Sequence, residues 1–368
     1  MHFLFENADR AVIKLGSNLL TDGSGSSNTQ RIAAICRQIH LLHDKGIQVI
    51  IVSSGAIGLG MGKLGYKRRP RDLASLQACA AVGQSILTDT WQAGFDPFSI
   101  VVAQVLLTRE DVRSRKRHVA VKNLFERLLS DHIVPIVNEN DSVSTDEIRF
   151  GENDVLSALV SSLTKTDILI ILSVIPGLID REGSGKTIPL VENFTPYIEK
   201  IAGDTDSTTS VGGMRSKIKA AKIAVKSGCA VFIGDGNDPD IIKHLFRGNA
   251  NGTFFMPNKI PLASRKRWIA FFENSKGSVT IDRGAHVAVT TEGRSLLARG
   301  IIGYRGEFEA GDVVKIESAD GVVIARGVCQ YASVELDAVL GQSSKQIHEI
   351  YPDRARFEVV HRDSLVIL

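Results

Sequence analysis

The chain has 368 residues, of which 43% are hydrophobic and 23% are charged, and its formal net charge is +3. These values are typical of a soluble globular protein and exclude a disordered or fibrous chain, and the length suggests two domains. The start of the sequence lacks the features of a signal peptide. No uncharged apolar run approaches the roughly 18–20 residues of a membrane helix, so we expect no membrane contact.

Strand-like and helix-like segments alternate over roughly the first 260 residues. The predicted strands are 11–15, 47–52, 99–106, 132–137, 167–172 and 230–233. The predicted helices are 29–43, 72–91, 112–129, 157–163 and 213–226. Alternation of this kind indicates right-handed βαβ units, a mostly parallel sheet and helices on both of its faces. We therefore predict an α/β protein whose first domain, residues 1–262, is an αβα sandwich.

The pattern changes after Pro257. A basic run at 265–267 precedes Trp268, and we expect residues 263–276 to form a linker that packs at least one aromatic side chain on a neighbouring surface. Short β-like runs follow, with glycine-containing turns between them, at 278–281, 286–289, 313–316 and 321–326. Short strands with such turns predict a small β-barrel-like domain over residues 277–368.

The stretch from Asn138 to Leu159 concentrates polar side chains around one loop. The sequence Asn-Glu-Asn-Asp (138–141) follows the predicted strand 132–137, and Glu-Asn-Asp (152–154) opens a helix that Asn153 or Asp154 is suited to cap. Open α/β sheets bind small polar ligands at the carboxyl ends of their strands. A solvated loop with a helix cap is the alternative, but two polar clusters bracketing one loop favour a ligand site.

Glycines accompany lysines at other strand ends and helix starts. Lys14 and Gly16 end the first predicted strand, the small-residue segment 53–62 forms a loop after the second, and 212–217 reads Gly-Gly-Met-Arg-Ser-Lys at the start of a helix. Backbone amides at helix starts and flanking lysines make sites for phosphate groups. Phosphoryl transfer needs such cations, together with polar groups that orient the acceptor.

Two nucleotide-binding patterns occur by chance. The segment 60–65 fits Gly-x-Gly-x-x-Gly, but it lies past the strand end and no acidic residue closes the next strand at a suitable place. Gly185-Lys-Thr187 resembles the end of a phosphate-binding loop, but Asp180 stands at the position of its first glycine and Pro189 follows where a helix must run. We reject both patterns.

The four cysteines are scattered and have no metal-ligand spacing. They are Cys36, Cys79, Cys229 and Cys329, each in an apolar context. Such cysteines are typical of small core residues kept reduced, so we expect a cytoplasmic protein.

Several motifs together resemble the glutamate 5-kinases of the amino-acid kinase family. They are IKLGS (13–17), VSSGAIGLG (52–60), QVLLT (104–108), PIVNENDSV (135–143), GENDVLSA (151–158), PGL (176–178), IAGD (201–204), GGMRSK (212–217) and RKRWI (265–269). The resemblance runs from about residue 10 to residue 365 and covers a C-terminal PUA domain. It implies ATP-dependent phosphorylation of the γ-carboxylate of L-glutamate, the first step of proline synthesis.

The resemblance also implies roles for individual residues. Lys14 and Lys217 contact the transferring phosphate, and Asp154 holds the two lysines in place. The residues implied to bind glutamate are Ser54, Gly55, Asn138, Asp141, Glu152 and Asn153. Asp141 can pair with the substrate ammonium, while serine and asparagine donate to its carboxylates. Glu152 stands where Asp is common in the family.

The nucleotide side is implied in the same way. The residues are Lys14, Gly16, Ser173, Val174, Val211, Gly212, Gly213, Met214, Arg215, Ser216 and Lys217. Val174 stands where the family has Asp, so we expect the backbone of 173–177, with its Pro176-Gly177 turn, to hold the base. Charge cancellation between anionic glutamate and ATP implies Mg²⁺ on the phosphates.

The resemblance further implies inhibition by L-proline, a homo-oligomer and a downstream glutamyl phosphate reductase. Two other functions compete with the kinase. An RNA-binding protein is one, because PUA domains elsewhere bind RNA, but residues 277–368 hold 10 Lys and Arg against 13 Asp and Glu, which argues against it. The other is a catalytically dead amino-acid sensor, which requires loss of Lys14, Lys217 or Asp154; all three are present.

Overall fold

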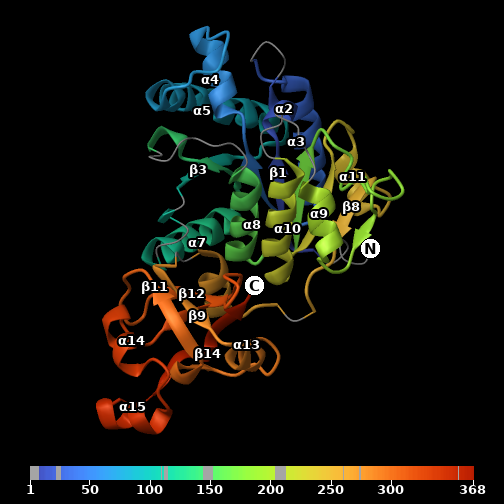
Figure 1. The fold of residues 1–368 in the computed structure, drawn as a ribbon. Coiled ribbons are helices and arrows are strands. Elements are labelled where there is room, and N and C mark those ends of the chain that lie inside the picture. Colours follow the sequence, from blue (N-terminus) through green and yellow to red (C-terminus); the bar gives the residue numbers. More distant parts are fainter. Residues whose placement is uncertain are drawn as a thin grey trace. The chain divides into compact units, whose positions relative to one another are not determined.

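The computed structural model describes residues 8–21, 26–108, 110–111, 115–143, 152–203, 213–259, 261–272, 275–354 and 356–368. The chain forms two compact units, Met1–Pro261 and Leu262–Leu368 (Figure 1). Among the described residues, no helix combines the length and apolar character needed to span a bilayer.

An eight-stranded sheet forms the centre of the first unit. Its strands are β1 (Arg10–Leu15), β2 (Gln48–Ser53), β3 (Val102–Leu107), β4 (Val134–Glu139), β5 (Ile168–Ser173), β6 (Leu190–Val191), β7 (Ala230–Asp235) and β8 (Gly252–Phe255). They lie in the order β3-β4-β2-β1-β5-β7-β8-β6, and every neighbouring pair is parallel except β7 and β8. The predicted mostly parallel sheet is therefore confirmed.

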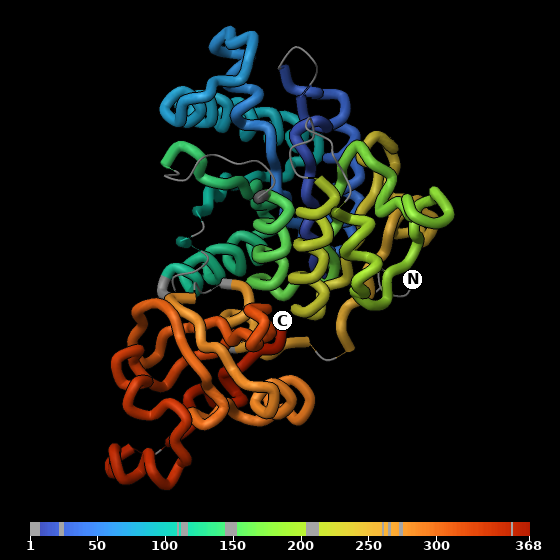
Figure 2. The backbone as a smooth tube through the Cα atoms, viewed as in Figure 1, coloured from blue at the N-terminus to red at the C-terminus, as the bar shows by residue number. Residues whose placement is uncertain are grey.

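Helices cover both faces of this sheet. One face packs against α3 (Thr29–His43), α5 (Leu73–Phe95) and α11 (Ile241–Phe246). The other packs against α7 (Arg115–Ser130), α8 (Glu152–Thr164), α9 (Pro196–Gly203) and α10 (Met214–Lys226), with α8 and α10 side by side (Figure 2). Successive side chains of β1 point to opposite faces of the sheet. Ile13 is buried against the first set of helices, and Val12 is buried against the second. The sandwich is of the predicted αβα kind.

Two short helices occupy segments that follow strands. These are α2 (Ser17–Leu20), after β1, and α4 (Ala56–Leu64), after β2. The sequence predicts a loop over 53–62, and this is wrong for α4, which packs closely against α5 (Figure 1). A Cβ at Gly60 would lie 1.8 Å from the carbonyl oxygen of Cys79, and one at Gly83 would lie 1.7 Å from that of Ala56. The small residues therefore allow close helix packing rather than an open loop.

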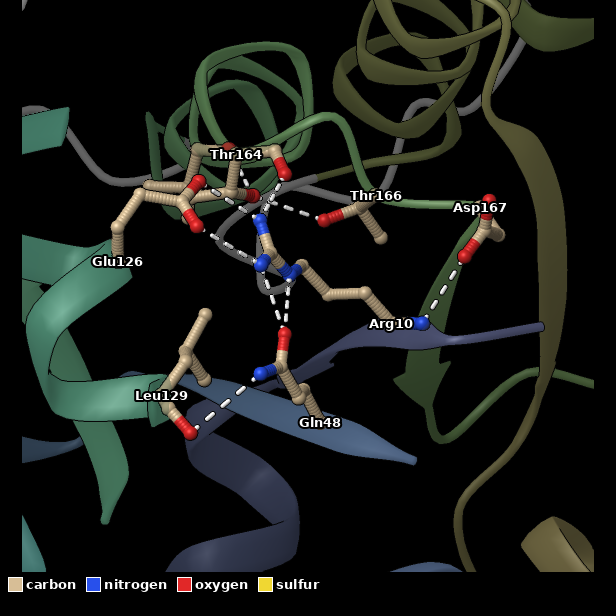
Figure 3. Close-up of polar contacts among 8 residues, drawn as sticks. Arg10, Gln48, Glu126, Leu129, Thr164, Thr166 and Asp167 are labelled. Atoms are coloured by element: carbon tan, nitrogen blue, oxygen red, sulfur yellow. Dashed lines mark hydrogen bonds and ion pairs between the residues drawn. The ribbon is translucent and has the colours of Figure 1, made fainter. Parts of the chain in front are cut away.

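A polar cluster around Arg10 ties the elements together at the amino end of β1 (Figure 3). The Arg10 guanidinium donates to Gln48 Oε1 over 2.7 Å and pairs with Glu126 Oε1 over 3.0 Å. It also donates to the Thr164 carbonyl, and Asp167 accepts from the Arg10 backbone amide over 2.9 Å. These contacts join β1 and β2 to α7 and the end of α8, at the opposite end of the strand from Lys14.

The second unit contains a six-stranded sheet. Its strands are β9 (Gly277–Ile281), β10 (Leu296–Leu297), β11 (Ile301–Arg305), β12 (Val313–Ser318), β13 (Val323–Cys329) and β14 (Glu358–Ile367), in the order β10-β14-β13-β12-β9-β11. Its helices are α12 (Ser264–Arg267), α13 (Arg283–Thr290), α14 (Ser333–Val339) and α15 (Ser344–Ile350). A π-helical turn over Trp268–Phe272 packs its Ile269 against Val313 and Val366 of the sheet.

One predicted strand of this unit is wrong. Residues 286–289 lie inside α13, whose start is capped by Asp282: the Asp282 carboxylate accepts a hydrogen bond of 2.7 Å from the Ala285 backbone amide. A four-residue run of alternating character fits both a strand and part of a helix, and here the cap decides in favour of the helix. Short 3₁₀ turns complete the two units at Asp96–Phe98, Asp141–Val143 and Ala298–Gly300.

Candidate active site

The predicted site residues gather at one edge of the first sheet because its central strands are parallel. Lys14 lies opposite Val52 of β2, and the next pair along, Leu15 and Ser53, brings the ends of β1 and β2 together. Asn138 and Glu139 end β4, which pairs with β2, and Ser173 ends β5, which pairs with β1. The carboxyl ends of β1, β2, β4 and β5 therefore lie together at one end of the sheet, as expected for neighbouring parallel strands.

Lys14, Asp154 and Lys217 form a buried cluster at that place. The Lys14 ammonium lies 2.5 Å from Asp154 Oδ1, and the Lys217 ammonium lies 3.1 Å from Asp154 Oδ2. The three side chains are 7%, 0% and 3% exposed, and they come from β1, α8 and α10. Two cations and one anion leave a net positive charge in a poorly hydrated place, which favours an anionic ligand.

The charges within this cluster oppose the effect of burial. Burial by itself raises the pKa of Asp154, but the adjacent charges of Lys14 and Lys217 outweigh it and hold that pKa below its ordinary value. Burial lowers the pKa of Lys217, and Lys14 adds to this, while Asp154 acts in the opposite direction. An anion bound here would stabilise the charged form of Lys217, so its binding energy is linked to that charge.

The sequence suggests Asn153 or Asp154 as a cap for α8, and this is wrong. The helix begins at Glu152, so both residues lie in its first turn. Their side chains make tertiary contacts instead: Asp154 with the two lysines, and Asn153 with Ser54 and Asn138.

A chain of side-chain amides lies beside the lysine cluster. Asn153 Nδ2 donates to Ser54 Oγ over 2.9 Å and to Asn138 Oδ1 over 3.0 Å. Asn138 Nδ2 donates in turn to Gln84 Oε1 over 2.9 Å, and Gln84 Nε2 donates to Gln104 Oε1 over 3.2 Å. Asn153 Oδ1 is buried and has no hydrogen-bond partner among the described residues. An unpaired buried acceptor is costly, so this atom indicates a place for a ligand donor.

Asp141 lies in the 3₁₀ turn after β4. Burial raises its pKa to about 7, with Glu139 adding to the rise and Arg69 opposing it. Because burial disfavours the charged form of this carboxyl group, a cationic ligand group beside it would stabilise the carboxylate. Gly55 is the N-cap of α4, and its φ of 102° favours glycine.

The residues predicted for the nucleotide lie around β5 and the start of α10. Gly213 is the N-cap of α10, and Met214, Arg215 and Ser216 form its first turn. Gly16 donates its amide to the Leu172 carbonyl over 3.2 Å, next to Ser173 at the end of β5. Val174 is 44% exposed. Val211, Gly212 and the side chain of Glu152 lie outside the described residues.

Two residues of the amide chain are not among the sequence predictions. Gln84 lies on α5 and is 8% exposed, and Gln104 lies on β3. Leu76, Ala80, Leu87 and Trp91 define the buried stripe of α5, and Gln84 interrupts it. A glutamine on an apolar helix face has to be hydrogen-bonded, and this is a signal that the sequence alone contains.

No three His, Cys, Asp or Glu side chains in the described part of the chain are grouped so as to hold a metal ion. Both Asp154 oxygens face lysine ammonium groups. The donor set here therefore suits an anion rather than a cation held by protein ligands alone.

The chain is similar in sequence to known proteins over nearly its whole length. The sequence model of the Amino acid kinase family matches residues 9–235, and that of the PUA domain matches residues 277–351. The chain is 40% identical to a glutamate 5-kinase of Caldanaerobacter subterraneus subsp. tengcongensis over 363 residues, which is 98% of each chain. It is 39% identical to a glutamate 5-kinase of Geobacter sulfurreducens over 369 residues, 99% of each. A solved carbamate kinase from Giardia lamblia bound to AMP-PNP has a TM-score of 0.48 at 16% identity, covering 68% of this chain and 99% of that one.

Proposed function

Because the chain belongs to the amino acid kinase family and carries a PUA domain, we propose that it transfers the γ-phosphoryl group of ATP to the γ-carboxylate of L-glutamate. Its relatives named glutamate 5-kinase match it over nearly their whole length. The observation that carries the proposal is the pairing of a buried cationic cluster with an amide and carboxylate cluster at one sheet edge. The product is L-glutamyl 5-phosphate, an intermediate of proline synthesis.

On the phosphate side, Lys14 and Lys217 bind the transferring group. Negative charge spreads over the phosphoryl oxygens during transfer, and fixed ammonium groups stabilise that charge without reorganisation. Asp154 holds both ammonium groups at their places, since each of its oxygens faces one lysine. The first turn of α10, from Met214 to Ser216, directs backbone amides toward the phosphates.

The base of the nucleotide lies at the end of β5. The exposed Val174 side chain offers no hydrogen bond, so the backbone of 173–177 holds the base. Gly177 has a φ of 140°, and a Cβ there would lie 2.6 Å from Thr253 Oγ1, so the turn needs glycine at this position.

On the acceptor side, Asp141 and the Asn153 end of the amide chain bind glutamate. The Asp141 carboxylate pairs with the substrate ammonium, and Ser54, Gly55 and Asn138 complete the pocket. Glu152 and Asn153, which open α8, belong to the same proposed set. This arrangement orients the γ-carboxylate toward the phosphorus atom, and several contacts together hold it in that orientation.

A divalent ion would arrive with the nucleotide. Mg²⁺ usually shares its oxygen ligands with substrate phosphates and water, so ATP itself would supply ligands for it. When bound, it neutralises phosphate charge that the two lysines leave uncompensated. Inhibition by L-proline, a homo-oligomeric state and delivery of the product to a glutamyl phosphate reductase belong to the same proposal.

A hydroxamate assay tests the proposed function. The acyl phosphate reacts with hydroxylamine, and the coloured hydroxamate then reports transfer to a carboxylate. We expect formation that depends on both ATP and L-glutamate and is lost in Lys217→Met. Hydrolysis of ATP with no hydroxamate from any carboxylate acceptor would contradict the proposal.

A further inference from the structure

We propose that Gln84 is a positioning residue: it determines which way the side-chain amides of Asn138 and Asn153 point. Asn153 thereby presents a hydrogen-bond acceptor to the substrate ammonium. This inference rests on the proposed function and adds a residue to it. Gln84 contacts neither the lysine cluster nor Asp154 through any hydrogen bond described for it, and it acts through Asn138.

The argument starts from the two ends of a side-chain amide, of which one donates and the other accepts. Gln84 Oε1 accepts from Asn138 Nδ2 over 2.9 Å, and this contact turns Asn138 Oδ1 toward Asn153. Asn153 must then direct its own Nδ2 at Asn138. The orientation of one buried amide therefore determines the orientation of the next two.

The consequence appears at Asn153. Both hydrogens of its Nδ2 are used inside the protein, one toward Ser54 and one toward Asn138, and only Oδ1 remains. That oxygen is buried and unpaired in the described part of the chain. At neutral pH both carboxylates of L-glutamate only accept hydrogen bonds, so its ammonium is the one group of this substrate that can donate to Asn153 Oδ1.

The other end of the Gln84 amide also has partners, on α5 and β3. Its Nε2 donates to Gln104 Oε1 over 3.2 Å and to Thr88 Oγ1 over 3.4 Å. The Thr88 hydroxyl lies 3.0 Å from the backbone carbonyl oxygen of Gln84 and 2.8 Å from the side-chain Oε1 of Gln104, so it can donate to either. Reversal of Gln84 alone, with Gln104 unchanged, would place its Oε1 against Gln104 Oε1 and leave two acceptors facing each other.

The backbone of α5 is also fixed at this position. Gly83, the preceding residue, packs directly against α4, because a Cβ there would lie 1.7 Å from the Ala56 carbonyl oxygen. The helix α5 therefore cannot move closer to α4 at this position. Asn138 is 2% exposed, so bulk water has little access to it when the Gln84 partner is lost. Removal of the Gln84 amide therefore leaves Asn138 free to reverse, and Asn153 with it.

The test compares Gln84→Met with the wild-type enzyme, because methionine keeps the length and burial of glutamine but lacks the amide. We expect KM for L-glutamate to rise about tenfold, the effect of losing roughly one hydrogen bond to a charged group, while KM for ATP stays within about twofold. In the Asn138→Ala background, Gln84→Met should change KM for glutamate by less than about twofold, because the residue through which it acts is gone.

A matched control separates positioning from a general effect on α5. Gln92 lies on the same helix and also anchors it, accepting from the Val102 amide over 3.1 Å and donating to the Ile100 carbonyl over 3.2 Å. Gln92→Met should lower the melting temperature without changing KM for glutamate. A purely structural role for Gln84 predicts that the two variants behave alike, and that result would overturn the inference.

Other outcomes are equally decisive. An unchanged KM in folded Gln84→Met, or equal increases in the wild-type and Asn138→Ala backgrounds, would refute the relay while leaving the proposed function intact. Absence of hydroxamate from the wild-type enzyme would instead refute the proposed function. Should Gln84→Met fail to fold, Gln104→Met on the outermost strand removes the group that holds Gln84, and an unchanged KM for glutamate there would count against the inference.

Discussion

The ammonium of Lys217 donates to Oδ2 of Asp154 over 3.1 Å, although 63 residues separate the two in the chain. They meet because α8 and α10 lie side by side on one face of the sheet. Lys14 reaches the other oxygen of the same carboxylate from β1. One buried anion therefore sets the spacing of two cations, and the phosphate side of the site depends on it.

The first prediction concerns Asp154→Asn. This change leaves two buried lysines without their anion, and removal of one partner from such a group costs about 3–5 kcal/mol in the free energy of unfolding. We expect a loss in that range by denaturant unfolding and a kcat reduced about a hundredfold or more, because the lysines lose their spacing. Stability equal to the wild type would show that the carboxylate is not the element that holds the lysines.

The second prediction separates the two sides of the site. Lys217→Ala should mainly lower kcat, because Lys217 meets charge that develops during transfer. Asp141→Ala should mainly raise KM for glutamate, because Asp141 binds the substrate in the ground state. Steady-state kinetics with both substrates measures this. If Lys217→Ala altered only KM and Asp141→Ala only kcat, the division between phosphate and substrate sides would be wrong.

The third prediction concerns pH. The pKa of Asp141 is raised to about 7, so its carboxyl is protonated at pH 6 and ionised at pH 8. Only the ionised form pairs with an ammonium group, so KM for glutamate should fall about tenfold as the pH rises from 6 to 8. Asp141→Asn should flatten this dependence. A KM that rises with pH over this range would contradict the assignment.

The fourth prediction concerns the contact between α4 and α5. Gly83→Ala places a Cβ 1.7 Å from the Ala56 carbonyl oxygen, so α4 has to move and Ser54, just before it, moves as well. We expect a stability loss of about 1–3 kcal/mol and a higher KM for glutamate. Gly203→Ala is the control, because a Cβ at Gly203 meets nothing within 4 Å. Equal effects of the two substitutions would exclude helix packing as the cause.

The sequence indicates the sheet and most of its helices because the signals there are local. The helix over 29–43 begins and ends as predicted, since its apolar spacing is regular and Asn28 caps it. The helix α4 is not indicated, because its glycines have meaning only against α5, a contact between distant segments. The strand predicted over 286–289 fails for a related reason: four residues do not distinguish a strand from a helix.

The site is predictable only in part. Lys14, Asp154 and Lys217 stand at strand ends and helix starts, and a parallel sheet brings such positions together. The orientation of Asn153 is not predictable, because it depends on Gln84 from a helix that the motifs do not include. Neither are the directions of the pKa shifts, which arise from burial that local sequence does not specify.

The most direct test of the central claim is the choice of acceptor. Hydroxamate formation with Mg-ATP should be measured side by side for L-glutamate, L-aspartate and N-acetyl-L-glutamate. We expect kcat/KM for L-glutamate to exceed both others at least about a hundredfold. Its free ammonium pairs with Asp141, and the length of its side chain places the γ-carboxylate at the lysines. A higher kcat/KM for N-acetyl-L-glutamate would contradict the account, since that acceptor has no ammonium for Asp141 to bind.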